Sequence, residues 1–437
     1  MHRIALALVW LTIASGAVVF TEPAPVDLLT IGLIVLLPVI GLVRFTPPLM
    51  VFLSLWLVVS ACTLLASTAS IDETKTLIHN GVSIYLYLAA FVFAGFVVHA
   101  PNRHTGLILH AYLAAALIAA AAGILGYFDW PSGAFDLFTR YGRATGPFKD
   151  PNVYGPFLVP GLMFLAHRIL NRPLHRSLGS IAAAAVIAFA LLLCFSRGAW
   201  VALAIAIVVY VYLAFITAAT NLLRLRIITF LIGGGLAATL LLGVALQFDK
   251  VADLFEQRAS VSQSYDEGPE GRFGGQQKAR DLILENPLGI GAQQFAPNYH
   301  FEEPHNVYLA MMLNAGWLGG LLFLFMVALT CLYGLRHAFR RTLTQPLFLV
   351  VYACFVGHAI EGYLIDLDHW RHFWLLMALI WGLMVGDRRL LAAPVVADPR
   401  AIFDQPELFV SQRAPRMLRP SPHMILTQSS TRRVARG

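Results

Sequence analysis

The feature that most constrains this chain is a series of apolar segments, each bounded by polar loops and each close to the length that crosses a lipid bilayer. A helix needs about 20 apolar residues to span the hydrocarbon core, where its backbone polar groups must be satisfied within the helix. We therefore expect an all-α polytopic membrane protein with about 12 transmembrane helices. The expected spans are residues 4–20, 26–43, 49–66, 78–98, 106–127, 155–170, 178–195, 199–216, 227–246, 307–335, 348–365 and 373–385.

Composition excludes several other classes of protein. Hydrophobic residues make up 58% of the chain and charged residues 13%, which is too apolar for a soluble domain. The four cysteines lie singly in apolar segments, so neither a disulfide framework nor a zinc-ligand spacing is present. The net charge of +7 is explained by arginines that anchor loops on the cytoplasmic side, and a nucleic-acid partner is not expected.

The distribution of arginines predicts the topology. The first segment lacks a small-x-small cleavage site, so we expect it to be retained as a span that leaves the N-terminus inside. Alternate loops then carry positive charge, as cytoplasmic loops do, and both termini are expected to be cytoplasmic. These loops hold Arg44; Arg103; Arg168, Arg172 and Arg176; Arg224 and Arg226; Arg336, Arg340 and Arg341; and Arg388 and Arg389.

The same pattern divides the chain into two parts. Residues 1–389 form the expected membrane domain, whose largest outward loop runs over residues 247–304. Residues 390–437 are rich in Arg, Pro and Ser and have no apolar period, so we expect a disordered, basic cytoplasmic tail.

A histidine marks the point where the long outward loop becomes a membrane helix. Pro304 ends the loop, and His305 and Asn306 occupy the positions where the first turn of a helix leaves N–H groups unsatisfied. An imidazole is therefore expected at the boundary between water and lipid. A lone histidine at such a place is more often a capping or interfacial residue than a catalytic one, so its neighbours decide between the two interpretations.

Arginines on the outer side are the neighbours that favour chemistry. Arg197 lies in a tight outer turn, where the positive-inside rule does not place a positive charge, although an interfacial arginine can also reach out of a membrane. In the long loop, an amphipathic helix is expected to begin near Arg272 and to end at Asn286, with Arg280 two turns further along. Planar guanidinium groups bind phosphate oxygens in pairs, so these residues predict an anionic substrate.

A third outer segment, residues 129–154, adds Arg143 and Asn152. Its Gly, Pro and Asn content predicts turns, and a helix cap is the default role for Asn152. A histidine and two to four arginines are thus expected on one face, an arrangement that can hold a diphosphate and move one proton.

Four motifs in order give these residues a family context. They are GPFKDPNVYGP, then SRGAW after an apolar span, then GRFGGQQKARDLILENPLGIGAQQF in the long loop, and PHNVYLAMMLNAGWLGGLLF at the start of the next span. Together they resemble the O-antigen ligase and O-antigen polymerase superfamily over roughly residues 143–323, while the remainder of the chain is similar only in character.

The resemblance implies a GT-C-like glycosyltransferase in the bacterial inner membrane, with a periplasmic active site. Its expected donor is a glycan on undecaprenyl diphosphate, and its expected acceptor is lipid A–core or a growing glycan. Membrane lipids surround the enzyme, and neither a cofactor nor a metal is expected. By position, Arg197 and Arg272 correspond to diphosphate-binding arginines and His305 to the catalytic base. Arg143, Asn152, Arg280, Asn306 and Glu361 are additional candidates for substrate binding, and Glu361 could instead pair with an arginine or orient His305.

Four alternatives remain open at this point. An O-antigen or exopolysaccharide polymerase would use the same donor as a ligase. Asp366, Asp368 and His369 have a D-x-D spacing that binds metal in other glycosyltransferases, although a short acidic outer loop is ordinary. A transporter of lipid-linked glycans would place ionisable groups near the bilayer midplane. A peptidoglycan-polymerising transferase would depend on a loop carboxylate such as Glu270 or Asp281.

Overall fold

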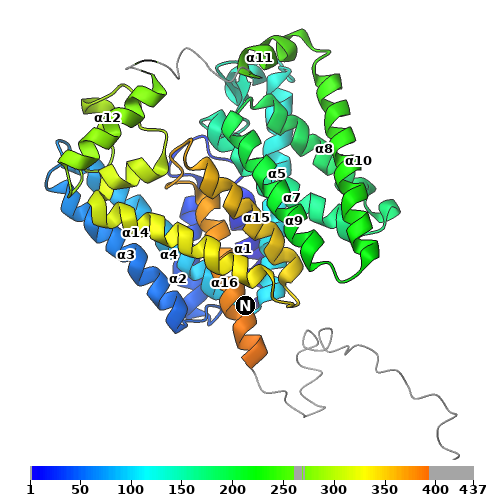
Figure 1. The fold of residues 1–437 in the computed structure, drawn as a ribbon, viewed down its shortest axis with the longest axis horizontal. Coiled ribbons are helices and arrows are strands. Elements are labelled where there is room, and N and C mark those ends of the chain that lie inside the picture. Colours follow the sequence, from blue (N-terminus) through cyan, green and yellow to red (C-terminus); the bar gives the residue numbers. More distant parts are fainter. Residues whose placement is uncertain (1, 260–267, 269–270, 393–437) are drawn as a thin grey trace, which may run out of the picture. The chain divides into compact units, whose positions relative to one another are not determined.

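Helices dominate the part of the chain that the computed structural model describes, which is residues 2–259, 268 and 271–392 (Figure 1). The expected all-α membrane architecture is confirmed. The helices that correspond to the twelve expected spans are α1 (His2–Ser15), α2 (Pro25–Val39), α3 (Pro47–Ser67), α4 (Glu73–His99), α5 (Pro101–Tyr127), α7 (Pro151–Asn171), α8 (Leu178–Leu193), α9 (Arg197–Thr217), α10 (Asn221–Ala245), α14 (Val307–Ala338), α15 (Gln345–Glu361) and α16 (Arg371–Ala392).

Seven of these helices are long and apolar enough to cross a membrane, judged on the described residues. They are α3, α4, α5, α7, α9, α10 and α14. Four others, α1, α2, α8 and α15, are apolar but shorter. The membrane class is therefore established, while the count of about twelve spans stays a prediction.

The segments between the long helices contain the remaining elements. Residues 129–150 hold the short helix α6 (Ala134–Phe138) and a hairpin of β1 (Thr139–Arg140) and β2 (Arg143–Ala144). The long loop forms α11 (Asp249–Ala259), α12 (Arg272–Glu285) and α13 (Phe295–Asn298), and the 3-10 helix η1 (Leu174–Arg176) joins α7 to α8. Helices α11 and α12 lie at the end of the bundle opposite the last turns of α16 (Figure 1). The expected helix of the long loop is confirmed as α12.

A cluster of large aromatic side chains lies among α3, α4, α14 and α16. The Trp56 ring lies 4.7 Å from that of Trp374, 5.2 Å from Tyr87 and 5.6 Å from Phe323, measured between centroids. Trp56, Phe323 and Trp374 are fully buried. Rings of this size supply much of the packing between helices in a lipid environment, where hydrophobicity alone does not hold helices together.

A kink in α14 positions the long loop. Gly316 has a φ of 66°, and a Cβ added there would lie 2.6 Å from the Leu288 carbonyl carbon. Residues after α12 fill this kink: the Ile290 N–H donates to the Leu313 carbonyl at 2.8 Å, and the Trp317 N–H donates to the Pro287 carbonyl at 2.9 Å. The end of α12 is thus held against the helix that follows His305.

The proposed cytoplasmic tail is not tested by this structure. The compact unit of the chain ends at Leu391, close to the expected boundary at residue 389. Residues 393–437 lie outside the described residues, and so does Glu270 of the long loop. The prediction of a disordered tail stays a prediction.

Candidate active site

The turn that carries His305 is fixed from several directions. Helix α14 begins at Val307, and the Asn306 side chain caps it by accepting the N–H groups of Tyr308 and Leu309 at 3.1 and 3.2 Å. His305 itself has a φ of 49°, a conformation that is rare for residues with a Cβ and often occurs at functional sites. Its Nε2 atom lies 3.1 Å from Glu302 Oε2. The expected position of His305, directly before a helix, is confirmed.

The segment that joins α15 to α16, residues 362–370, braces this turn. The Val307 N–H donates to the Gly362 carbonyl at 2.8 Å, and the Asn306 N–H donates to Asp366 Oδ1 at 3.0 Å. The Tyr308 hydroxyl donates to the Ala359 carbonyl within α15. The location of His305 therefore depends on residues more than fifty positions further along the chain.

Arg272 connects α12 to the same two segments. It is the first residue of α12, and its Nη2 atom donates to the His305 carbonyl at 3.4 Å and to the Leu364 carbonyl. The side chain is half-buried. Arg280, two turns further along α12, is exposed, so the structure places the two arginines of this helix in different environments.

Arg197 opens α9 at the same end of the bundle. Ser196 caps this helix, its Oγ accepting the Ala199 N–H at 3.4 Å. The next residue, Gly198, packs against Glu361 at the end of α15, since a Cβ added to Gly198 would lie 2.9 Å from Glu361 Oε1. Glu361 is 1% exposed, and among the described residues its Oε2 atom has no hydrogen-bond partner. This close approach brings the Arg197 turn to the end of α15. The residues that follow α15, 362–370, contact the His305 turn.

Arg143 and Asn152 form hydrogen bonds to the residues just before Arg197. Arg143 is 6% exposed and donates through Nε to the Cys194 carbonyl and through Nη2 to Asn152 Oδ1, both at 2.8 Å. Asn152 Oδ1 also accepts the Ser196 hydroxyl at 3.1 Å. Helix α7 is capped by Asp150, which accepts the Asn152 N–H at 2.6 Å, so the default expectation that Asn152 is the cap is wrong.

These contacts form one continuous series. It runs from Arg143 and Asn152 to the Ser196–Gly198 turn, then through Glu361 and Gly362 to the His305 turn and Arg272. Residues separated by more than a hundred positions in the sequence are thereby brought to one end of the bundle. Arg280 is exposed on α12 and is not part of this series.

A comparison with protein families decides the classification. Residues 182–324 match the family model described as O-antigen ligase. Over these residues, about a third of the chain, the protein is similar to the O-antigen ligase family. This similarity supports a function of the O-antigen ligase or polymerase type, with a lipid-linked glycan and an acceptor as partners in general terms. No curated protein matches the chain.

The O-antigen ligase match covers the chain from α8 to the middle of α14. It includes Arg197, Arg272 and His305, whereas Arg143, Asn152 and Glu361 lie outside it. The structure thus joins residues of the O-antigen ligase region to residues on both sides of it in the sequence.

Two carboxylates beside His305 were missed or misinterpreted from the sequence. No motif in the sequence singles out Glu302, although it lies only three positions before His305 and contacts its Nε2 atom. The sequence presents Asp366 as part of a D-x-D spacing typical of a metal site, whereas in the structure its carboxylate accepts the Asn306 N–H. Burial raises the pKa of Asp366 to about 7, against the opposing effects of His305 and of the Asn306 hydrogen bond. No sequence signal reveals this contact, because it depends on how residues 362–370 fold back.

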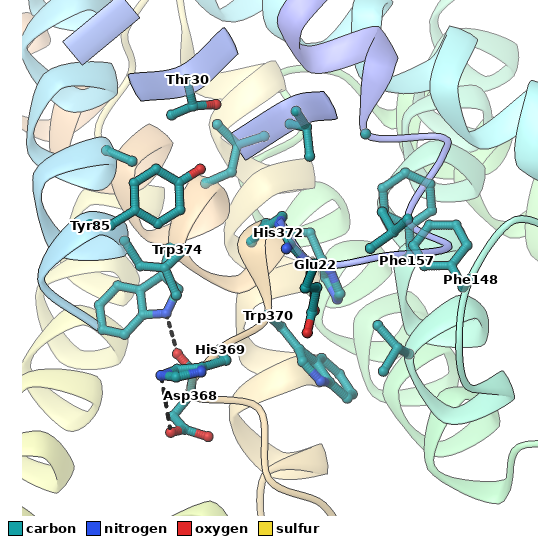
Figure 2. Close-up of a pocket in the computed structure, with 18 of the residues that line it drawn as sticks. Glu22, Thr30, Tyr85, Phe148, Phe157, Asp368, His369, Trp370, His372 and Trp374 are labelled. Atoms are coloured by element: carbon teal, nitrogen blue, oxygen red, sulfur yellow. Dashed lines mark hydrogen bonds and ion pairs between the residues drawn. The ribbon is translucent and has the colours of Figure 1, made fainter. Parts of the chain in front are cut away.

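The two carboxylates of the D-x-D motif have different nearest partners. Asp366 contacts the His305 turn, while Asp368 Oδ2 faces His79 of α4 and the neighbouring His369. The same segment lines a cavity of about 340 Å³ that also borders Tyr85 and Trp370 (Figure 2). Both carboxylates line this cavity, although Asp366 bonds to the His305 turn and Asp368 faces the two histidines.

Proposed function

We propose that this protein transfers a glycan from undecaprenyl diphosphate to an acceptor sugar hydroxyl on the periplasmic face of the bacterial inner membrane. The proposed acceptor is the lipid A–core oligosaccharide, which makes the enzyme an O-antigen ligase. One observation carries the proposal: the segments that bear Arg197, Arg272 and His305 meet at one end of the bundle, within the region that matches the O-antigen ligase family.

Arg197 and Arg272 are the proposed diphosphate ligands. Each is the first residue of a helix, where exposed N–H groups and the helix dipole also favour negative charge. Guanidinium groups neutralise the diphosphate as it leaves, so the leaving group needs no proton. Arg280 and Glu361 stay candidates for contacts to the substrate: Arg280 is exposed on α12, and Glu361 lies beside the Arg197 turn.

His305 is the proposed general base. The acceptor oxygen attacks the anomeric carbon, the bond from that carbon to the diphosphate oxygen breaks, and the hydroxyl proton passes to the imidazole. Glu302, 3.1 Å from Nε2, would stabilise the imidazolium that results. A single displacement of this kind inverts the anomeric carbon and needs no covalent carboxylate intermediate.

Arg143, Asn152 and Asn306 are proposed to position these groups. Arg143 and Asn152 hold the turn before Arg197, and Asn306 holds the helix that follows His305. Their hydrogen bonds to protein atoms favour this role over direct substrate binding.

The placement of charge supports an enzyme over a transporter. Arg197, Arg272 and His305 lie at helix starts or in the turn before a helix, whereas a transporter concentrates such groups in broken helices near the midplane. The transferase that depends on a loop carboxylate would use Glu270, outside the described residues, or Asp281, which is exposed on α12.

Deletion of the gene tests the choice of acceptor. Loss of a ligase should leave lipopolysaccharide with bare core, seen by electrophoresis, while full-length polymer accumulates on undecaprenyl diphosphate. Core that carries at most one repeat, or loss of a secreted polysaccharide with intact lipopolysaccharide, would instead identify a polymerase. Either of those results overturns the ligase assignment and keeps the proposed donor chemistry.

A further inference from the structure

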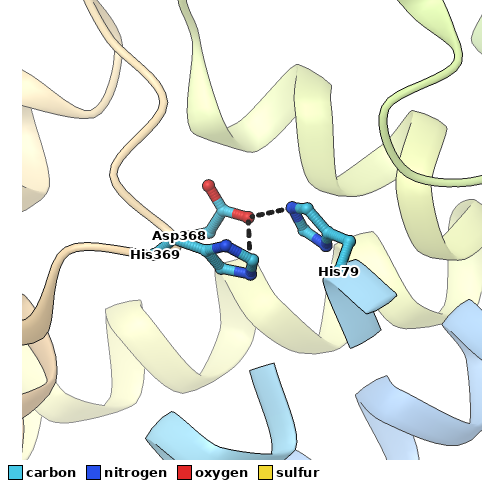
Figure 3. A group of neighbouring side chains, drawn as sticks. All are labelled: His79, Asp368 and His369. Carbon is cyan, nitrogen blue, oxygen red and sulfur yellow. Dashed lines mark ion pairs between the residues drawn. The ribbon is translucent and has the colours of Figure 1, made fainter. Parts of the chain in front are cut away.

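Two histidines and a carboxylate converge away from the proposed transfer site. His79 lies in the second turn of α4, while Asp368 and His369 lie in the 362–370 segment (Figure 3). His79 Nε2 is 3.4 Å from Asp368 Oδ2, and His369 Nε2 is 4.0 Å from the same oxygen. One potential ligand atom from each residue falls within 4.8 Å of the others. Three side chains from two distant segments therefore direct metal-binding atoms toward one small space.

Hydrogen bonds explain only part of this geometry: His369 Nε2 is hydrogen-bonded to the Ser83 hydroxyl at 3.0 Å, but its contact with Asp368 is longer. The distances of 3.4 and 4.0 Å exceed the usual range for an N–H···O hydrogen bond. The two imidazole rings stack with centroids 3.8 Å apart and an angle of 24°, and His79 Nδ1 is buried with no partner among the described residues. The distances from Asp368 Oδ2 to the two Nε2 atoms are the feature that hydrogen bonding leaves unexplained.

A metal ion fits the spacing. Ligands about 2.0–2.1 Å from a tetrahedral ion lie roughly 3.4 Å from one another. The measured distances of 3.4 and 4.0 Å are close to that value, with the second slightly long. The Ser83 hydroxyl is hydrogen-bonded to His369 Nε2 at 3.0 Å, and this nitrogen would exchange that bond for the ion. Side-chain exposures of 10% for His79 and 13% for Asp368 show that the space is largely shielded from solvent.

Charge around the cluster also favours a cation. Burial raises the pKa of Glu303, and the nearby Asp368 carboxylate raises it further. Asp366 precedes Asp368 by two residues and lines the same cavity. The nearest arginine, Arg371, is already paired with Asp27, with its Nε 2.6 Å from Oδ1. Three carboxyl groups are therefore gathered where a divalent ion would relieve their repulsion.

We propose that His79, Asp368 and His369 bind one divalent transition-metal ion, with Zn²⁺ favoured over Mg²⁺. Two imidazole nitrogens and one carboxylate suit zinc, whereas magnesium prefers oxygen ligands alone. The ion ties the 362–370 segment to α4. That segment also supplies the Leu364 carbonyl to Arg272 and the Asp366 carboxylate to the His305 turn, so the ion positions the loop and takes no part in bond exchange.

Metal content tests the proposal independently of transfer. The full chain is purified in detergent through a tag without histidine, incubated with Zn²⁺ or Mg²⁺, desalted and measured by inductively coupled plasma mass spectrometry. The wild type should retain about one equivalent of zinc and no magnesium. The matched control His175→Ala, an exposed histidine in η1, should behave like the wild type.

Two variants address the ligands. His79→Ala and the isosteric Asp368→Asn should each reduce bound zinc at least tenfold, and the visible absorption of a Co²⁺-loaded sample should disappear with them. Failure of the wild type to retain zinc would overturn the proposal even if the variants fold poorly. If both variants retain as much zinc as the wild type, the ion binds elsewhere, and that result would also overturn the proposal.

Discussion

Replacing Arg143 with lysine should impair transfer although this side chain is not proposed to touch substrate. The guanidinium donates to the Cys194 carbonyl and to Asn152 Oδ1, both at 2.8 Å, and a single ammonium group cannot reproduce both directions. Loss of one hydrogen bond to a charged donor costs about 1.5–3 kcal/mol of unfolding free energy. Because Cys194 lies two residues before Ser196, the same loss loosens the turn that places Arg197.

A loosened turn should also displace Arg197 and so lower the rate of transfer. A shift of about 1 Å in a group that orients substrate can cost a hundredfold in rate. Arg143→Lys should therefore lower the thermal midpoint of the purified protein and reduce transfer about 10- to 100-fold. The matched control is Arg140→Lys, at the paired position of the same hairpin, whose exposed side chain donates to the Lys149 carbonyl. Wild-type midpoint and rate in Arg143→Lys would refute the reasoning.

The remaining predictions concern the other contacts of the site. Gly198→Ala should fold normally, since only the flexible end of the Glu361 side chain must move, yet it should lower the transfer rate. The control is Gly179→Ala, because no atom lies within 4 Å of its added Cβ. Equal transfer rates in the two variants would remove Glu361 from the site. Arg272→Lys should reduce transfer strongly, because one ammonium group cannot bridge two carbonyls and a phosphate, and retention of the full rate would contradict this role. Cysteine labelling should place Gly198, Gly268 and Pro304 in the periplasm, and Asn171 and Asn221 in the cytoplasm. Labelling of Gly198 and Pro304 from opposite faces of the membrane would end the shared-site model.

The membrane architecture could be predicted from the sequence because its physical basis is local. Apolar length and arginine placement are properties of single segments, and each expected span has a helix at the matching place. The cap of α14 and the helix that begins at Arg272 were likewise local signals, carried by Asn306 and by the Gly and Pro residues that flank α12.

The contacts between these segments could not be predicted in the same way. The function of residues 362–370 in bracing His305 depends on tertiary packing across more than fifty residues. Asn152 was assigned to a cap because Asn caps helices well, but Asp150 takes that position and leaves Asn152 to Arg143. His79 had no sequence signal at all, since its neighbours in space lie almost 300 positions later.

The most direct test of the proposed chemistry is the transfer rate of His305→Gln with purified protein and an undecaprenyl-diphosphate-linked glycan as donor. Glutamine keeps the approximate size and polarity of the side chain but cannot accept the proton. Loss of a general base predicts a fall of about 100- to 10,000-fold in rate, with normal protein yield and thermal midpoint. His175→Gln, a change in an exposed histidine outside the site, should retain the wild-type rate. A wild-type rate in His305→Gln would contradict the account.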